Sequence, residues 1–103
     1  MEKLWKLRAE IEVEPGDLDL DPGYEKGFMN VITWANSADS ARVKLANYLA
    51  TFNWSLLAVK HSAPVEDSEV FDSEVAELVD KARENQSAIL LGTFHSYLSP
   101  KVC

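Results

Sequence analysis

The chain has 103 residues, of which 47% are hydrophobic and 26% are charged, and its formal net charge at pH 7 is −7. This length and composition predict a single globular domain over residues 1–103 and exclude a disordered polymer. No run of about eighteen apolar residues is present, so no membrane partner is expected. The charged N-terminus lacks the apolar stretch of a signal peptide, and the single cysteine, Cys103, excludes an internal disulfide. A reducing, cytoplasmic location is expected.

Acidic residues gather in two stretches that contain no Lys or Arg. Residues 10–25 and 66–80 hold fourteen of the seventeen Asp and Glu residues. Nucleic-acid binding normally requires a basic patch that neutralises phosphates, so no nucleic acid is expected as a partner. Two interpretations of the acidic stretches stay open. They keep the protein in solution by self-repulsion, or they form a negative face for a basic partner protein.

Two strands are predicted in the first third of the chain. In residues 4–14 the odd positions are apolar and the even positions are charged. This alternation is typical of a strand with one buried and one solvated face, and Pro15-Gly16 ends it. Residues 28–35 are apolar at nearly every position and rich in β-forming residues. They therefore predict a strand that is covered on much of both faces.

The segment between these strands carries three aspartates two residues apart, Asp17, Asp19 and Asp21. An EF-hand calcium loop would need a glycine at its sixth position and a bidentate Glu at its twelfth. Counted from Asp17, these positions are occupied by Pro22 and Phe28. The segment is therefore predicted to be a solvated acidic turn, and no metal is expected there.

The first helix is predicted within residues 36–53. Ser37 is a suitable N-cap, and Asn53 can end the helix in a left-handed conformation. The apolar residues recur at helical spacing and are Ala38, Ala41, Leu45, Tyr48, Leu49 and Phe52. Residues 54–61 then predict a strand that Pro64 prevents from continuing far.

A second helix and a last strand complete the chain. The helix is predicted in residues 72–86, with Asp72 or Ser73 as its cap. Its apolar stripe consists of Val75, Leu78, Val79 and Ala82. Residues 88–98 predict the last strand, within which Gly92 marks a bulge or a close approach of another group.

The resulting order is β-β-α-β-α-β. A strand-helix-strand path favours parallel pairing through a right-handed crossover, which would place both helices on one face of the sheet. If residues 65–71 add a short strand, residues 28–97 follow a βαββαβ order that resembles the ferredoxin-like fold in the order of its elements. The predicted fold class is thus an α+β two-layer sandwich, with a mixed sheet of four to five strands and two helices on one face.

Candidate residues for chemistry are few. No nucleotide-binding loop and no nucleophile elbow is present, so neither a cofactor nor a catalytic residue is predicted. His61 and His95 lie near the ends of two predicted strands. If those strands are parallel neighbours, both imidazoles and Tyr97 would line one ligand pocket at the same end of the sheet. No metal-ligand spacing accompanies the two histidines.

The strands between residues 28 and 97 are apolar at both even and odd positions. Two helices on one face would leave one set uncovered, and a large apolar surface usually marks an interface. The residues expected on this uncovered face are Val31, Leu57, Val59 and Leu91. They predict a homodimer, unless another layer of the chain covers the face.

Two functions from different classes are therefore expected. The first is a small, acidic, non-enzymatic protein that binds a protein partner through an open sheet face or its acidic rim. By class, such a chain resembles bacterial immunity proteins, which are small and acidic, lack catalytic motifs and bind basic toxins. The alternative is a small-ligand-binding or catalytic domain with a pocket near His61, His95 and Tyr97.

Overall fold

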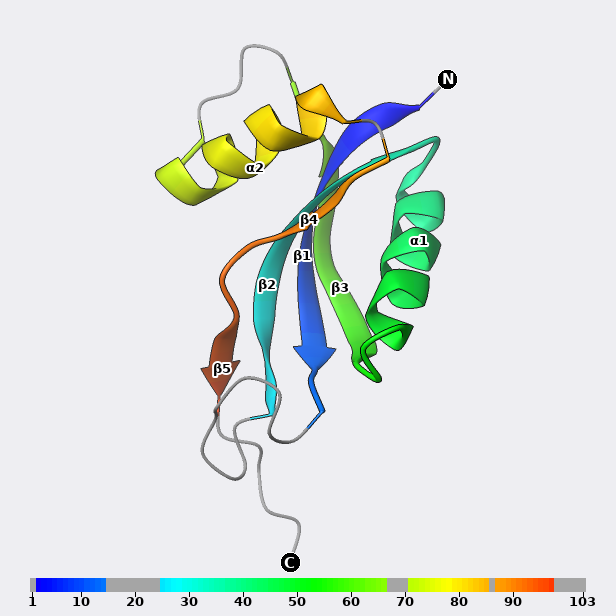
Figure 1. Cartoon of the computed structure of the whole chain (residues 1–103), viewed down its shortest axis with the longest axis vertical. Helices are drawn as coiled ribbons and strands as arrows, with labels where there is room; N and C mark the ends of the chain where they lie inside the picture. Colours follow the sequence, from blue (N-terminus) through cyan, green and yellow to red (C-terminus); the bar gives the residue numbers. More distant parts are fainter. Residues whose placement is uncertain (1, 15–24, 67–70, 86, 98–103) are drawn as a thin grey trace, which may run out of the picture.

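The computed structural model of the chain describes residues 2–14, 25–66, 71–85 and 87–97. It has one five-stranded antiparallel sheet and two helices, drawn in Figure 1. The elements are β1 (Lys3–Glu12), β2 (Lys26–Ala35), α1 (Ala38–Ala50), β3 (Ser55–Pro64), α2 (Ser73–Glu84), β4 (Ile89–Leu91) and β5 (His95–Tyr97). The predicted α+β class is confirmed. Within the described residues, neither helix has the length and apolarity that a membrane span requires.

The sheet is antiparallel throughout, which corrects the prediction of a mixed sheet. Its strand order is β3-β1-β2-β4, and β5 pairs with the same strand as β4, further along β2. The strands β2 and β3 do run in the same direction, as a strand-helix-strand path favours. However, β1 lies between them and pairs with both. The strand β1 pairs with β2, its neighbour in sequence, along one edge, so its other edge is available to pair with β3.

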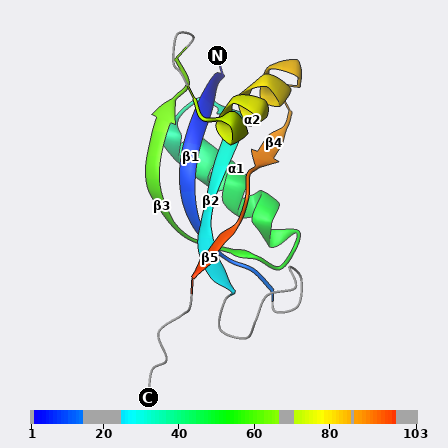
Figure 2. The same cartoon turned by 90° about the vertical axis from the view of Figure 1, so that its left-hand side faces the viewer.

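The two helices pack against opposite faces of the sheet, whereas the sequence predicted one shared face. Buried residues of α1 cluster with Leu7 and Val31, and those of α2 cluster with Leu4 and Ile32. Since successive side chains of a strand point to opposite faces, Val31 and Ile32 lie on different sides. Figure 2 shows α2 in front of the sheet and α1 behind it. The double apolar character of β2 is thereby explained.

The helices differ in how much of the sheet they cover. The helix α1 runs beside β2 and β3. The hydrophobic core beneath it reaches along the sheet from Ala35, at one end of β2, to Val13, just after β1. By contrast, α2 covers only the end of the sheet where β1 begins (Figure 1). Over the rest of the sheet, only α1 of the two helices packs on the strands. This part of the domain is therefore a two-layer α+β sandwich.

The local signals at the helix ends are confirmed. Ser37 caps α1, because its Oγ accepts a hydrogen bond of 3.1 Å from the Ser40 N–H. Asp72 caps α2 in the same way, and its Oδ1 accepts from the Val75 N–H at 3.0 Å. Asn53 has a φ of 61°, the left-handed conformation that ends helices and that Asn tolerates.

The last predicted strand is divided into β4 and β5 at Gly92. A Cβ on this glycine would meet the Oε1 of Glu74 and would lie 3.2 Å from the Asn30 carbonyl oxygen. The Gly92 N–H donates to that carbonyl at 2.8 Å, so the chain stays beside β2 where the ladder is interrupted. Of the possible extra strand at 65–71, residues 65, 66 and 71 are not in a strand and the others lie outside the described residues.

Candidate functional site

The structure separates the two histidines of the predicted ligand pocket. His61 lies on β3 in register with Arg8, and His95 lies on β5 in register with Phe28. These strands are on opposite edges of the sheet, with β1 and β2 between them. At about 4.8 Å for each step between strands, the two histidines are on the order of 14 Å apart. They therefore do not line one pocket.

Tyr97, the third residue of that group, contacts Glu10 instead. Its hydroxyl donates a short hydrogen bond to Glu10 Oε2, and the other Glu10 oxygen lies 3.7 Å from Lys60 Nζ. The Tyr97 ring packs against Phe28 with 5.5 Å between centroids. The Arg8 guanidinium lies over the Phe28 ring, with its Cζ 5.4 Å from the ring centroid. The hydrogen bond to Glu10 is the main cause that raises the pKa of Tyr97. These side chains form a mixed-charge, solvated part of the sheet beyond α2.

Only one of the four predicted interface residues is exposed. Val31 has an exposed fraction of 0% and lies in the core with α1. Val59 and Leu91 are partly buried and pack against the same core. Leu57 is 42% exposed, because it lies at a register shift between β1 and β3 where the alternation of side chains is interrupted. These residues therefore do not form one uncovered apolar face.

A cluster of aromatic rings lies where α1 ends and β3 begins. The rings of Tyr48 and Phe52 meet edge to face at 5.3 Å between centroids, and those of Phe52 and Trp54 lie 5.2 Å apart. We call these three residues the aromatic corner. Phe52 is 41% exposed, and Tyr48 and Trp54 are partly buried. The sequence had placed Tyr48 and Phe52 on the buried stripe of the helix.

The backbone of the aromatic corner is held by its own hydrogen bonds. The N–H groups of Phe52 and Trp54 both donate to the Leu49 carbonyl, at 3.0 and 3.1 Å. The Thr51 hydroxyl donates to the Tyr48 carbonyl at 2.6 Å. The left-handed Asn53 between the two rings allows this closure. These hydrogen bonds hold the backbone on both sides of Phe52.

An acidic cavity of about 330 Å³ opens at the end of β1. Figure 1 shows that β1 ends next to the turn that leads into β3, and both contribute residues to the lining. Its lining residues are Glu12, Val13, Glu14, Glu25, Asn53 and Ser55. Its lining includes Asn53 and Ser55, which flank Trp54 in sequence, but none of the three residues of the aromatic corner. The Val13 N–H donates to the Glu25 carbonyl at 2.8 Å, which fixes two sides of the cavity to each other.

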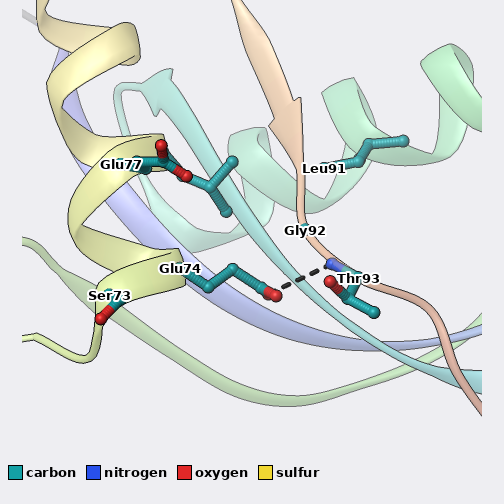
Figure 3. A pocket seen from close by; sticks show the side chains of 7 residues that line it. Ser73, Glu74, Glu77, Leu91, Gly92 and Thr93 are labelled. Atoms are coloured by element: carbon teal, nitrogen blue, oxygen red, sulfur yellow. Dashed lines mark hydrogen bonds between the residues drawn. The ribbon is translucent and has the colours of Figure 1, made fainter.

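A second, wider cavity of about 740 Å³ lies between α2 and the β4–β5 connection (Figure 3). It is lined by Ser73, Glu74, Glu77, Leu78, Leu91, Gly92 and Thr93. Glu74 reaches across it, and its Oε1 accepts a hydrogen bond of 3.1 Å from the Thr93 N–H. Hydrogen bonds from the side chain and the backbone of Thr93 lower the pKa of Glu74. This carboxylate is therefore engaged in holding α2 to the connection.

We expect Glu74→Gln to make the free energy of unfolding depend less on pH in the acid range. Because its pKa is lowered from 4.5 in the folded chain, ionised Glu74 stabilises the fold above that value, and the contribution is lost as the pH falls through the lowered pKa. At neutral pH the variant should lose less than about 1 kcal/mol, because exposed charges are screened. Urea unfolding from neutral to acid pH measures this. An equal acid-induced loss in both proteins would contradict the role of Glu74.

Metal-binding geometry is not found among the described residues: no three His, Cys, Asp or Glu side chains lie close enough together to hold an ion. The three aspartates of the acidic turn and Cys103 lie outside the described residues. Comparisons with protein families, with curated proteins and with solved structures find no match. The functional argument therefore rests on the geometry of this chain.

Proposed function

We propose that this chain is a non-enzymatic domain that binds a protein partner through the aromatic corner. The observation that carries the proposal is the exposed ring of Phe52, held between Tyr48 and Trp54 on a hydrogen-bonded turn. Aromatic side chains are enriched at the centres of protein interfaces, and a turn whose backbone is already held loses little conformational entropy on binding. A cytoplasmic location, expected from the single cysteine, is part of the same proposal.

Other surfaces support the proposal less well. The edge strand β3 has two register shifts along β1 and ends at Pro64, features that hinder the addition of another strand. The predicted ligand pocket loses its basis, since His61 and His95 lie on opposite edges. The argument for a homodimer weakens as well, because α2 covers Ile32 and α1 covers Val31. The homodimer itself stays a prediction that sedimentation equilibrium can decide.

We expect Phe52→Ser to abolish partner binding while leaving the fold intact, because this ring is exposed and its removal opens no cavity in the core. Val43→Ser is a matched control, since Val43 is 50% exposed on α1, the helix that precedes Phe52, and is not part of the aromatic corner. Loss of a central aromatic anchor typically weakens an interface by about 2 kcal/mol or more.

The measurement is affinity capture with three immobilised proteins, the native chain and the two variants, from one extract of its source cells. The proposal is supported by a protein that the native chain and Val43→Ser retain and that Phe52→Ser loses. It is contradicted if all three retain the same set of proteins. Circular dichroism and urea unfolding confirm that each variant is folded.

A further inference from the structure

We infer that a cavity beside the N-terminus of α2 binds a phosphate group. The cavity has a volume of about 290 Å³ and lies on the face of the sheet that α2 covers in part. Its lining residues are Lys6, Leu7, Arg8, Asn30, His61, Asp72 and Val75. The aromatic corner precedes the first residue of β3, whereas His61 lies near the end of that strand. The cavity is therefore a separate site, and the inference goes beyond the proposed function.

Three polar side chains of the cavity stand in one row across neighbouring strands. Arg8 on β1 is in register with Asn30 on β2 and with His61 on β3. Residues that lie opposite each other in antiparallel strands share a face, with Cβ atoms about 4.5–5.5 Å apart. Lys6 precedes Arg8 by two positions and lies on the same face. One tetrahedral group in the cavity can therefore contact side chains from more than one strand.

Two neighbours hold the guanidinium of Arg8. Its Cζ lies 5.4 Å from the centroid of the Phe28 ring, and its Nη1 donates a long hydrogen bond of 3.5 Å to Asn30 Oδ1. This bond uses one of the five N–H groups of a guanidinium, and Arg8 is exposed. The guanidinium can therefore donate two parallel hydrogen bonds to an oxyanion that enters from solvent.

The lining of the cavity is positively charged, although the chain has a net charge of −7. Lys6 and Arg8 bring two cationic groups, and Asp72 brings the one carboxylate of the lining. This carboxylate is engaged as the N-cap of α2, since its Oδ1 accepts from the Val75 N–H at 3.0 Å. The positive end of the helix dipole lies at the same place and opposes the effect of the carboxylate on an anion.

Two carboxylates outside the lining are engaged with other groups. Glu10 on β1 accepts a hydrogen bond from the Tyr97 hydroxyl and lies 3.7 Å from Lys60 Nζ. Glu74 on α2 accepts from the Thr93 N–H at 3.1 Å. These contacts direct both carboxylates to groups that do not line the cavity.

A phosphate group fits these donors better than a carboxylate does. A phosphate monoester carries about −1.5 to −2 charges at pH 7 and has three strong acceptor oxygens, whereas a carboxylate has two oxygens in one plane. Arg8 can bind two phosphate oxygens, and the imidazole of His61 has an N–H for the third in either protonation state. The Lys6 ammonium, 5.2 Å from the centroid of the Phe71 ring, adds positive charge on the side of α2.

The test is a titration of the isotope-labelled chain, followed by NMR. The probes are inorganic phosphate and three short glycine-serine peptides, which carry phosphoserine, unmodified serine or glutamate at one central position. We expect saturable shifts of the amide signals of residues 6, 8, 30 and 61 with inorganic phosphate and with the phosphoserine peptide. The glutamate peptide should bind more weakly, and the serine peptide should not bind.

The two phosphate probes distinguish the sources of the group. Tighter binding of the phosphoserine peptide than of inorganic phosphate assigns the cavity to a phosphorylated side chain of a partner. Equal or tighter binding of inorganic phosphate assigns it to a free anion. Both results support the inference, because the same phosphate chemistry is recognised.

Variants of the chain locate the contact. Arg8→Gln removes the bidentate donor and should weaken binding of phosphate at least about tenfold, and His61→Ala should weaken it about threefold. The matched control is Lys60→Gln, which removes the same charge from a residue beside His61 that does not line the cavity. It should change binding by less than about twofold. All three residues are exposed, so these substitutions leave the core intact, and the remaining amide signals report the fold.

Three outcomes would overturn the inference. The first is the absence of a saturable shift at these residues with either phosphate probe. The second is a glutamate peptide that binds as tightly as the phosphoserine peptide. The third is an equal effect of Arg8→Gln and Lys60→Gln, because binding would then depend on net charge and not on the cavity. The proposed function is tested independently by capture with Phe52→Ser.

Discussion

We expect Val31→Asp to unfold the domain at room temperature. Val31 has no solvent exposure and lies in the core that α1 shares with Leu7 and Ile11. A charge buried there without a partner costs several kcal/mol, while the whole domain is expected to be stable by about 5–15 kcal/mol. Circular dichroism and the dispersion of NMR signals measure the loss. The result would differ from the sequence-based expectation, in which Val31 lies on an uncovered face and the substitution only separates a dimer.

Leu57→Asp provides the matched comparison. The same change at this position places the charge on a side chain that is 42% exposed at a register shift of β3. Substitutions at such positions usually change the free energy of unfolding by less than about 0.5 kcal/mol. If both variants remain folded, or if both unfold, the placement of Val31 under α1 and of Leu57 in solvent is wrong.

The second large effect is expected for Gly27→Ala, which should detach β5 from the sheet. A Cβ at Gly27 would lie 2.5 Å from the His95 carbonyl oxygen and 2.8 Å from both Phe94 Cζ and Ser96 Cα. Two of these three atoms belong to the backbone and cannot rotate away. Overpacking of this kind typically costs about 1–3 kcal/mol, measured here by urea unfolding.

Two further measurements tie the effect to β5. Hydrogen exchange should accelerate at the amides of residues 95–97, which pair with residues 26–28. The pKa of Tyr97 should fall toward its ordinary value of 10.0, because the hydrogen bond to Glu10 that raises it is lost with the strand. Unchanged exchange and an unchanged tyrosine titration would contradict the prediction.

Gly92→Ala is the control for this substitution. There the nearest atom to the added Cβ is the end of the Glu74 side chain, a flexible group that can move aside. We expect a smaller loss of stability than at Gly27, together with a pKa of Glu74 closer to its ordinary value, because the bond to Thr93 is displaced. A larger loss at Gly92 than at Gly27 would reverse this order.

The sequence by itself determined the local elements. The alternation in residues 4–14 places Leu7, Ala9 and Ile11 in the core, as the structure confirms. Ser37, Asp72 and Asn53 mark helix ends, because capping depends on neighbours within a few residues along the chain. For the same reason the stripe of α2 was predictable from its spacing alone.

The tertiary structure decided which surfaces meet. An apolar residue in the sequence indicates that its side chain is buried, but not which element buries it. Val31 and Ile32 therefore could not be distinguished in the sequence, although α1 covers Val31 and α2 covers Ile32. Strand order depends on contacts between distant residues, and the insertion of β1 between β2 and β3 placed His61 and His95 on opposite edges.

The aromatic corner depends on both levels. The spacing of Tyr48 and Phe52 is helical, and the helix stop at Asn53 could be read from the residue type. The exposure of Phe52 could not, because it follows from α1 ending at Ala50 and from the turn that directs the chain into β3. The acidic cavity is lined by residues from the end of β1, from the residue before β2 and from the turn before β3. Only folding brings Glu12 and Ser55 together, since residues separated by dozens of positions become neighbours through the pairing of strands.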